Sequence, residues 1–144
     1  MSATNAFENG ILSLIFENAN YANVGDATGL RGSTTAGVFY ISLHTGDPGE
    51  TGTQTTSESA YTNYARVSVA RSTSGWTVAS GVADNDAAIT FPACGVTGSS
   101  VTHCGIGSDT SGTGNLFLSG TSTLTVSNGV TPAFAIGALD ITFD

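Results

Sequence analysis

Apolar residues recur at helical spacing only near the start of the chain. Asn5 with Glu8 three residues later is typical of a capping box, and Gly25 is a plausible end signal. The apolar stripe consists of Phe7, Ile11, Leu14 and Ile15, widened by Leu12 and Phe16. The pattern predicts an N-terminal helical segment over residues 5–24.

From residue 37 onward the pattern changes to short apolar runs and alternating segments separated by turn residues. Val38 to His44, "VFYISLH", is the strongest aromatic and β-branched run. Further strands are predicted over residues 65–71, 76–78, 88–91, 101–106, 115–119, 122–127, 132–136 and 139–143. Many short strands at regular spacing predict an all-β fold, a jelly-roll-like β-sandwich over 37–144, preceded by the short helix in a single domain of 1–144.

Charge restricts the classes of partner. The 144 residues include eleven acidic side chains but only three cations, Arg31, Arg66 and Arg71, for a net charge of −8. Binding nucleic acid or an anionic membrane needs clustered Lys and Arg, so neither is expected as a partner. A surface this acidic favours docking onto a basic one.

The start of the chain has no basic segment followed by an apolar run, so we expect no signal peptide and synthesis in the cytoplasm. Cys94 and Cys104 are then expected to be reduced and buried, with a disulfide as the less favoured alternative.

The stretch "LHTGDPGETGTQTT" raises the question of a metal site at His44, Asp47 and Glu50. No second histidine stands at ligand spacing, and the glycines lack the Lys-Ser/Thr of a phosphate-binding loop. The favoured interpretation is a long, exposed loop from Thr45 to about Tyr61 that contacts another chain, because loops of this length are often functional.

Other candidates for chemistry are weaker. His103 and Cys104 are adjacent on a predicted strand and therefore point to opposite faces. The "DND" of residues 84–86 lacks calcium-loop spacing and predicts a turn with solvated acids. No catalytic, cofactor or metal residue is predicted, and no enzyme activity; a hydrolase or lyase using His44 or His103 is the rival interpretation.

Six stretches in order resemble small virion proteins of tailed bacteriophages. They are "TNAFENGILSLIF", "NVGDATGL", "FYISLHTGDPGETGTQTTSESAYTNYARVSVAR", "ITFPACG", "VTHCGIG" and "VTPAFAIGALDITFD". Relatives in this family are labelled tail fiber proteins or cement (decoration) proteins. The resemblance implies a jelly-roll cement protein on the outer surface of an icosahedral capsid, bridging neighbouring major capsid protein subunits. The alternative is a tail fiber or receptor-binding component, for which Tyr61, Tyr64 and Trp76 are candidate sugar contacts.

The expected partners are the major capsid protein and further copies of this chain, with a homodimer favoured over a homotrimer. Contacts are expected from the N-terminal segment, the Thr45–Tyr61 loop and the terminal strand. The interface candidates are Phe7, Ile11, Leu14, His44, Asp47, Glu50, Glu58, Tyr61 and Phe143. For Phe7, Ile11 and Leu14 the alternative is packing on the protein's own core.

Overall fold

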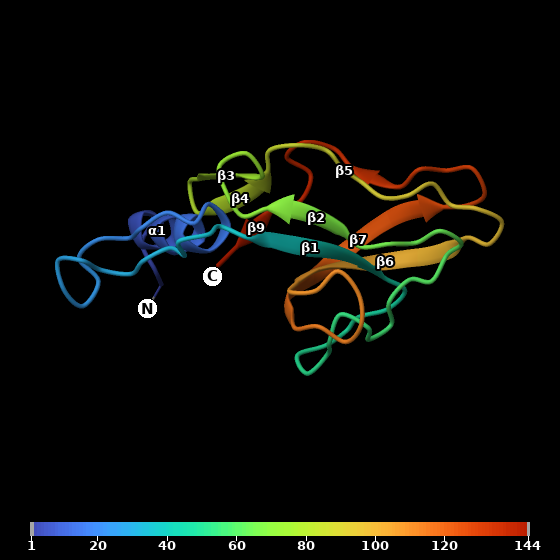
Figure 1. Cartoon of the computed structure of the whole chain (residues 1–144), viewed down its shortest axis with the longest axis horizontal. Coiled ribbons are helices and arrows are strands. Elements are labelled where there is room, and N and C mark those ends of the chain that lie inside the picture. Colours follow the sequence, from blue (N-terminus) through green and yellow to red (C-terminus); the bar gives the residue numbers. More distant parts are fainter. Residues whose placement is uncertain (1, 144) are drawn as a thin grey trace. The chain divides into compact units, whose positions relative to one another are not determined.

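The computed structural model describes residues 2–143, which form one helix and nine strands (Figure 1). These residues divide into two compact units, and each unit is assembled from segments distant in sequence. The first comprises residues 2–37, 70–88 and 134–143, and the second comprises residues 38–69 and 89–133. The predicted all-β class with one short N-terminal helix is confirmed, and the antiparallel sheets are consistent with a sandwich. The single domain over 1–144 stays a prediction.

The second unit is built on a four-stranded sheet in the order β2-β1-β6-β7. Its strands are β1 (Val38–His44), β2 (Val67–Ala70), β6 (Ser99–Gly107) and β7 (Leu116–Val126). Strand β1 matches its predicted bounds because aromatic and β-branched residues fill it. The apolar core of this unit includes Ile41 and Leu43 of β1 and Val101, Cys104 and Ile106 of β6.

Strand β7 corrects the sequence-based prediction of two strands over 115–119 and 122–127. It continues through Gly120 and pairs with β6 in antiparallel register, with a shift between Val101 and His103. A bulge of this kind keeps a strand continuous while it absorbs an extra residue. A short two-stranded sheet joins β5 (Ile89–Thr90) and β8 (Ala133–Phe134).

The first unit packs helix α1 (Asn5–Phe16) with the sheet β3-β4-β9, whose strands are Trp76–Ala79, Val82–Asn85 and Ile141–Thr142. The Phe16 and Trp76 rings lie 4.8 Å apart at 59° and form its centre. The helix differs from its prediction at both ends. Thr4, not Asn5, is the N-cap, and its side chain accepts a hydrogen bond from the backbone N–H of Phe7.

The predicted helical segment of 5–24 is too long, because the helix ends at Phe16. Asn18 takes the left-handed conformation (φ 59°), which an α-helix does not continue through. The predicted 84–86 turn is also wrong: Asp84 and Asn85 belong to β4, where Asn85 is buried.

Candidate functional site

The nine predicted interface residues fall in both units. Four of them lie in the first unit, namely Phe7, Ile11, Leu14 and Phe143. The other five lie in the second unit, namely His44, Asp47, Glu50, Glu58 and Tyr61. Each group is therefore described by itself.

The α1 helix buries a different face from the one that the apolar stripe emphasised. Leu12 and Phe16 are fully buried, whereas Ile11 and Leu14 are half-buried and Phe7 is 46% exposed. The Phe7 ring packs only loosely against Tyr21, at 6.1 Å between centroids. Leu12 and Phe16, which widen the apolar stripe, therefore anchor the helix. Phe7 lies on the exposed side of the helix.

The carboxyl end of α1 is held by Arg71. Its guanidinium donates hydrogen bonds to the carbonyls of Ile15 (2.5 Å) and Leu14 (2.6 Å) and to Oδ1 of Asn18 (2.8 Å). These carbonyls have no partner within a helix, and a cation there also interacts favourably with the helix dipole. Phe143, the last predicted contact of this unit, follows β9 and is half-buried.

The Thr45–Tyr61 loop is closed at its base by backbone hydrogen bonds. Thr45 N–H donates to the Ser57 carbonyl (2.7 Å), and Ser59 N–H donates to the Leu43 carbonyl (2.7 Å). The loop presents exposed residues to solvent, Asp47 and Glu50 among them, but Pro48, Gln54, Ser59 and Tyr61 are buried. The loop is a folded part of the second unit.

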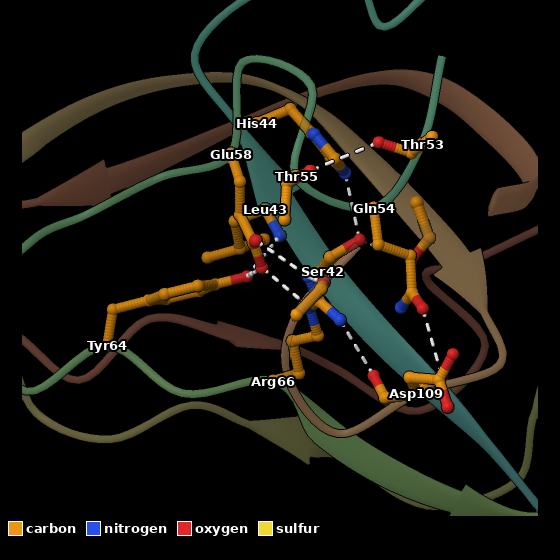
Figure 2. A network of polar contacts seen from close by, with 12 residues as sticks. Ser42, Leu43, His44, Thr53, Gln54, Thr55, Glu58, Tyr64, Arg66 and Asp109 are labelled. Atoms are coloured by element: carbon orange, nitrogen blue, oxygen red, sulfur yellow. Dashed lines mark hydrogen bonds and ion pairs between the residues drawn. The ribbon is translucent and has the colours of Figure 1, made fainter. Parts of the chain in front are cut away.

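A buried ion pair anchors the end of this loop (Figure 2). Arg66 donates from Nε to Oε1 of Glu58 and from Nη2 to Oε2, both at 2.7 Å, and the pair is 2% and 16% exposed, respectively. The same guanidinium donates to the carbonyls of Asp109 (2.9 Å) and Gly112 (2.7 Å), which ties in a second loop. The hydrogen bond to Glu58 raises the pKa of Arg66, and burial opposes that shift.

Two tyrosines extend this network. The Tyr64 hydroxyl donates to Glu58 Oε1 (2.9 Å) and accepts from the backbone N–H of Leu43 (3.0 Å). Burial raises its pKa well above its usual value. The Tyr61 hydroxyl donates to the Pro92 carbonyl (2.8 Å), and burial raises its pKa to about 12. Both hydroxyls are therefore neutral structural donors at physiological pH.

Gln54 joins the two loops from inside. Its side-chain Oε1 accepts from Asp109 N–H (2.9 Å), and its backbone N–H donates to the Thr113 carbonyl (3.1 Å). The side chain is fully buried in a space where Gly107 and Gly114 supply no Cβ: an added Cβ would lie within 2.3 Å of Gln54 atoms. Glycine at these two positions makes room for the glutamine.

His44 and Ser42 form a polar pair in β1. His44 Nδ1 lies 2.8 Å from the Thr56 carbonyl, so this nitrogen carries the proton, and Nε2 accepts from the Ser42 hydroxyl at 2.8 Å. Burial lowers the pKa of His44, which favours this neutral form. Both side chains are fully buried, so the pair holds the Thr56 end of the loop and faces no open site.

The exposed acids of this loop lie at its tip. Asp47 and Glu50 are exposed on either side of buried Pro48, and Asp47 Oδ1 accepts from Gly49 N–H (2.9 Å). Gly49 has φ 68°, and its carbonyl accepts from Gly52 N–H (3.1 Å). The tip is therefore an ordered turn that presents two carboxylates to solvent.

Two residues of this network, Arg66 and Gln54, were not predicted from the sequence as part of a site. The composition does indicate an ion pair for Arg66, because a chain with eleven acids and only three cations is expected to pair its cations. For Gln54 the sequence has no comparable signal, since its burial depends on glycines more than fifty residues away. His44, Glu58 and Tyr61 shape the loop from inside, and their direct contact with another chain stays a prediction.

Across residues 2–143, no group of three or more His, Cys, Asp and Glu side chains is placed to hold a metal ion. In the same part of the chain, no helix has the length and apolar character needed to cross a membrane. Cys94 and Cys104 are free and buried, as expected.

A family model matches the chain over residues 2–142. The matching family model is described as Gp80, podophage GP4 fiber I protein gp80. No curated protein matches the chain. The match agrees with the resemblance to small tailed-phage virion proteins.

Proposed function

The chain belongs to the Gp80 family of phage virion proteins, and we propose that it is a structural subunit of a fiber on the virion of a podophage. The observation that supports this proposal is the match over residues 2–142, whose named member is a fiber I protein. The role proposed is mechanical: the protein holds other virion proteins together without chemistry of its own.

The ordered acidic tip of residues 47–50 is the proposed attachment point. Its carboxylates are exposed and its backbone is fixed by hydrogen bonds, while the loop behind it is anchored by the buried Glu58–Arg66 pair. A contact surface that is already ordered loses little conformational entropy when it docks. With a net charge of −8, the fitting partner is a basic surface on a neighbouring virion protein.

A capsid cement protein is the second candidate function. The six stretches that resemble small phage virion proteins favour it, because relatives in that group include decoration proteins. In this role the protein binds the major capsid protein and bridges neighbouring subunits. Many repeated weak contacts add through multivalency, and binding to the assembled lattice stabilises the lattice.

Labelling intact particles with an antibody to this protein separates the two candidates. Label on the tail in a few copies per particle supports the fiber subunit, and label over the whole head in many copies supports the cement protein. Label on neither overturns both.

Variants with Asp47→Asn and Glu50→Gln test the attachment point. We expect the doubly substituted protein to be incorporated less well into particles, and wild-type attachment to weaken as salt increases. The control is Asp86→Asn, which removes an exposed acid of the first unit. Equal incorporation of all three proteins, or attachment unchanged by salt, overturns the electrostatic docking.

A further inference from the structure

The two edges of the four-stranded sheet differ sharply. Strand β2 is four residues long and is followed directly by Arg71, whereas β7 has eleven residues, "LFLSGTSTLTV", with no charge and no proline. Proteins normally protect an edge with short strands, charges or proline, because its unpaired N–H and C=O groups bind other strands. The β7 edge lacks these three protections, and its irregularities are the two register shifts against β6, opposite Val101–His103 and Ile106–Gly107.

The middle of β7 is open to solvent. Ser119, Gly120 and Thr121 are exposed, and a Cβ added at Gly120 would have nothing within 4 Å. Phe117 is 52% exposed although its ring packs on Phe39 at 6.2 Å. A groove separates residues 116–119 from the neighbouring turn of Gly49, Glu50 and Gly52. Among the described residues, no strand pairs with this edge.

The sequence of β7 resembles its own reverse about Thr121, except that Phe117 is opposed by Thr125. Reading outward in both directions, the opposed pairs are Gly120 with Ser122, Ser119 with Thr123, Leu118 with Leu124, Phe117 with Thr125, and Leu116 with Val126. Leu118 thus meets Leu124 and Leu116 meets Val126 on the inner side, and the hydroxyls of Ser119 and Thr123 meet nearer the centre. Cross-strand pairs of these kinds stabilise antiparallel strands.

Charge favours a second copy of the chain at this edge. Two copies with a net charge of −8 each repel one another over most of their surfaces. Strand β7 contains none of the fourteen charged residues, so it is a long segment along which two copies approach without opposed carboxylates.

We propose that β7 pairs in antiparallel register with β7 of a second copy, about a two-fold axis at Thr121. The pairing joins two four-stranded sheets into one of eight strands and makes the interface of a homodimer. An interface of this type is self-complementary, as two-fold symmetry requires. The proposal is independent of whether the protein sits on the tail or the head.

The test measures association of the full-length protein by sedimentation velocity. We expect the wild type to sediment at twice 14.4 kDa. Thr121→Asp places two carboxylates opposite each other on the axis and should raise the dissociation constant by at least about tenfold. The matched control is Ser68→Asp, at an exposed residue of the opposite edge strand β2, which should leave the dimer intact.

Cross-linking tests the register. Under mild oxidation Thr121→Cys should form a disulfide with its own counterpart, because the two residues face each other on the axis. Thr125→Cys should not, since its counterpart would lie roughly 27 Å away along the strands, at about 3.4 Å per residue. The native cysteines are buried and contribute little background.

A wild-type monomer at 100 µM overturns the proposal, as does a dimer that Ser68→Asp disrupts and Thr121→Asp does not. A dimer in which Thr121→Cys cross-links no faster than Thr125→Cys overturns the two-fold register.

Discussion

The guanidinium of Arg66 and the carboxylate of Glu58 form a two-point hydrogen-bonded ion pair, with both N–O distances at 2.7 Å. Glu58 belongs to the loop after β1, and Arg66 stands immediately before β2. Because the same arginine also binds the carbonyls of Asp109 and Gly112, one side chain fixes two loops of the second unit. The loop that carries the exposed 47–50 tip is thus anchored at Glu58 by a buried group.

Replacing Arg66 should therefore destabilise the fold strongly. Arg66→Met leaves Glu58 without its cation and should lower the free energy of unfolding by about 3–5 kcal/mol, the usual loss when one partner of a buried ion pair is removed. Urea denaturation measures this change. Arg31→Met is the control: Arg31 is exposed, and its loss should cost no more than about 0.5 kcal/mol. Equal effects of the two substitutions would contradict the anchoring role.

His44 should make stability depend on pH. Burial lowers its pKa in the folded protein, whereas the unfolded chain keeps a value near 6.5. Below about pH 6.5 the unfolded state therefore binds a proton that the folded state does not. The free energy of unfolding should fall as pH decreases from 6.5 toward the lowered pKa, by at most about 1.4 kcal/mol per pH unit, and this contribution should be constant above 6.5.

The measurement is urea denaturation between pH 5.5 and 7.5 for the wild type and for His44→Gln. The charged groups that act on His44 are Glu58, Arg66 and His103, and all three are kept in the variant. In the His44→Gln variant, the free energy of unfolding should no longer fall as pH decreases below 6.5. If His44→Gln fails to fold, an NMR titration of the wild-type His44 ring should give a midpoint below 6.5; a midpoint at or above that value refutes the prediction.

Gly105 should not tolerate a side chain. A Cβ there would lie 2.6 Å from Leu116 Cδ1 and 2.8 Å from His44 Nε2, so Gly105→Ala forces the Ser42–His44 pair to move. Overpacking of this kind costs about 1–3 kcal/mol in thermal or urea unfolding. Gly120→Ala is the matched control in the neighbouring strand, because its Cβ meets nothing within 4 Å; it should change stability by less than about 1 kcal/mol. A similar loss in both variants would show that close packing at Gly105 is not the cause.

Local sequence pattern predicted the elements whose stability is local. The run from Val38 to His44 became β1 with the predicted bounds, and the apolar stripe placed α1. The helix end was missed because a positive φ at Asn18 needs no glycine, and the sequence offered Gly25 as the more obvious signal.

The candidate site was harder to predict, because its contacts join distant parts of the chain. In the sequence His44 ends a predicted strand and Tyr61 ends the predicted exposed loop, yet their burial depends on β6 and on the segment around Pro92. In a chain with few charges, several polar side chains hold the interior through hydrogen bonds, as Gln54, Ser42 and Asn85 do.

Asn85 gives the sharpest test of that interior role in the first unit. Its Nδ2 donates to the carbonyls of Ala87 and Ala135, both at 2.8 Å, and its Oδ1 accepts from the N–H groups of Ala138 (3.1 Å) and Leu139 (2.9 Å). The side chain is 1% exposed, so no solvent replaces these partners. It therefore fixes the segment that leads into β9.

Asn85→Asp keeps the shape of the side chain but exchanges two donated protons for a carboxylate that faces two carbonyl oxygens. We expect a loss of about 2–4 kcal/mol in unfolding free energy at neutral pH, because a buried group loses its partners and gains a charge. Hydrogen exchange should also speed up at the N–H groups of Ala138 and Leu139. Asp86→Asn, one residue away and exposed, serves as the control and should leave both measurements nearly unchanged. If the two substitutions have the same small effect, the C-terminal segment is held by its apolar contacts through Leu139 and Ile141, and not by Asn85.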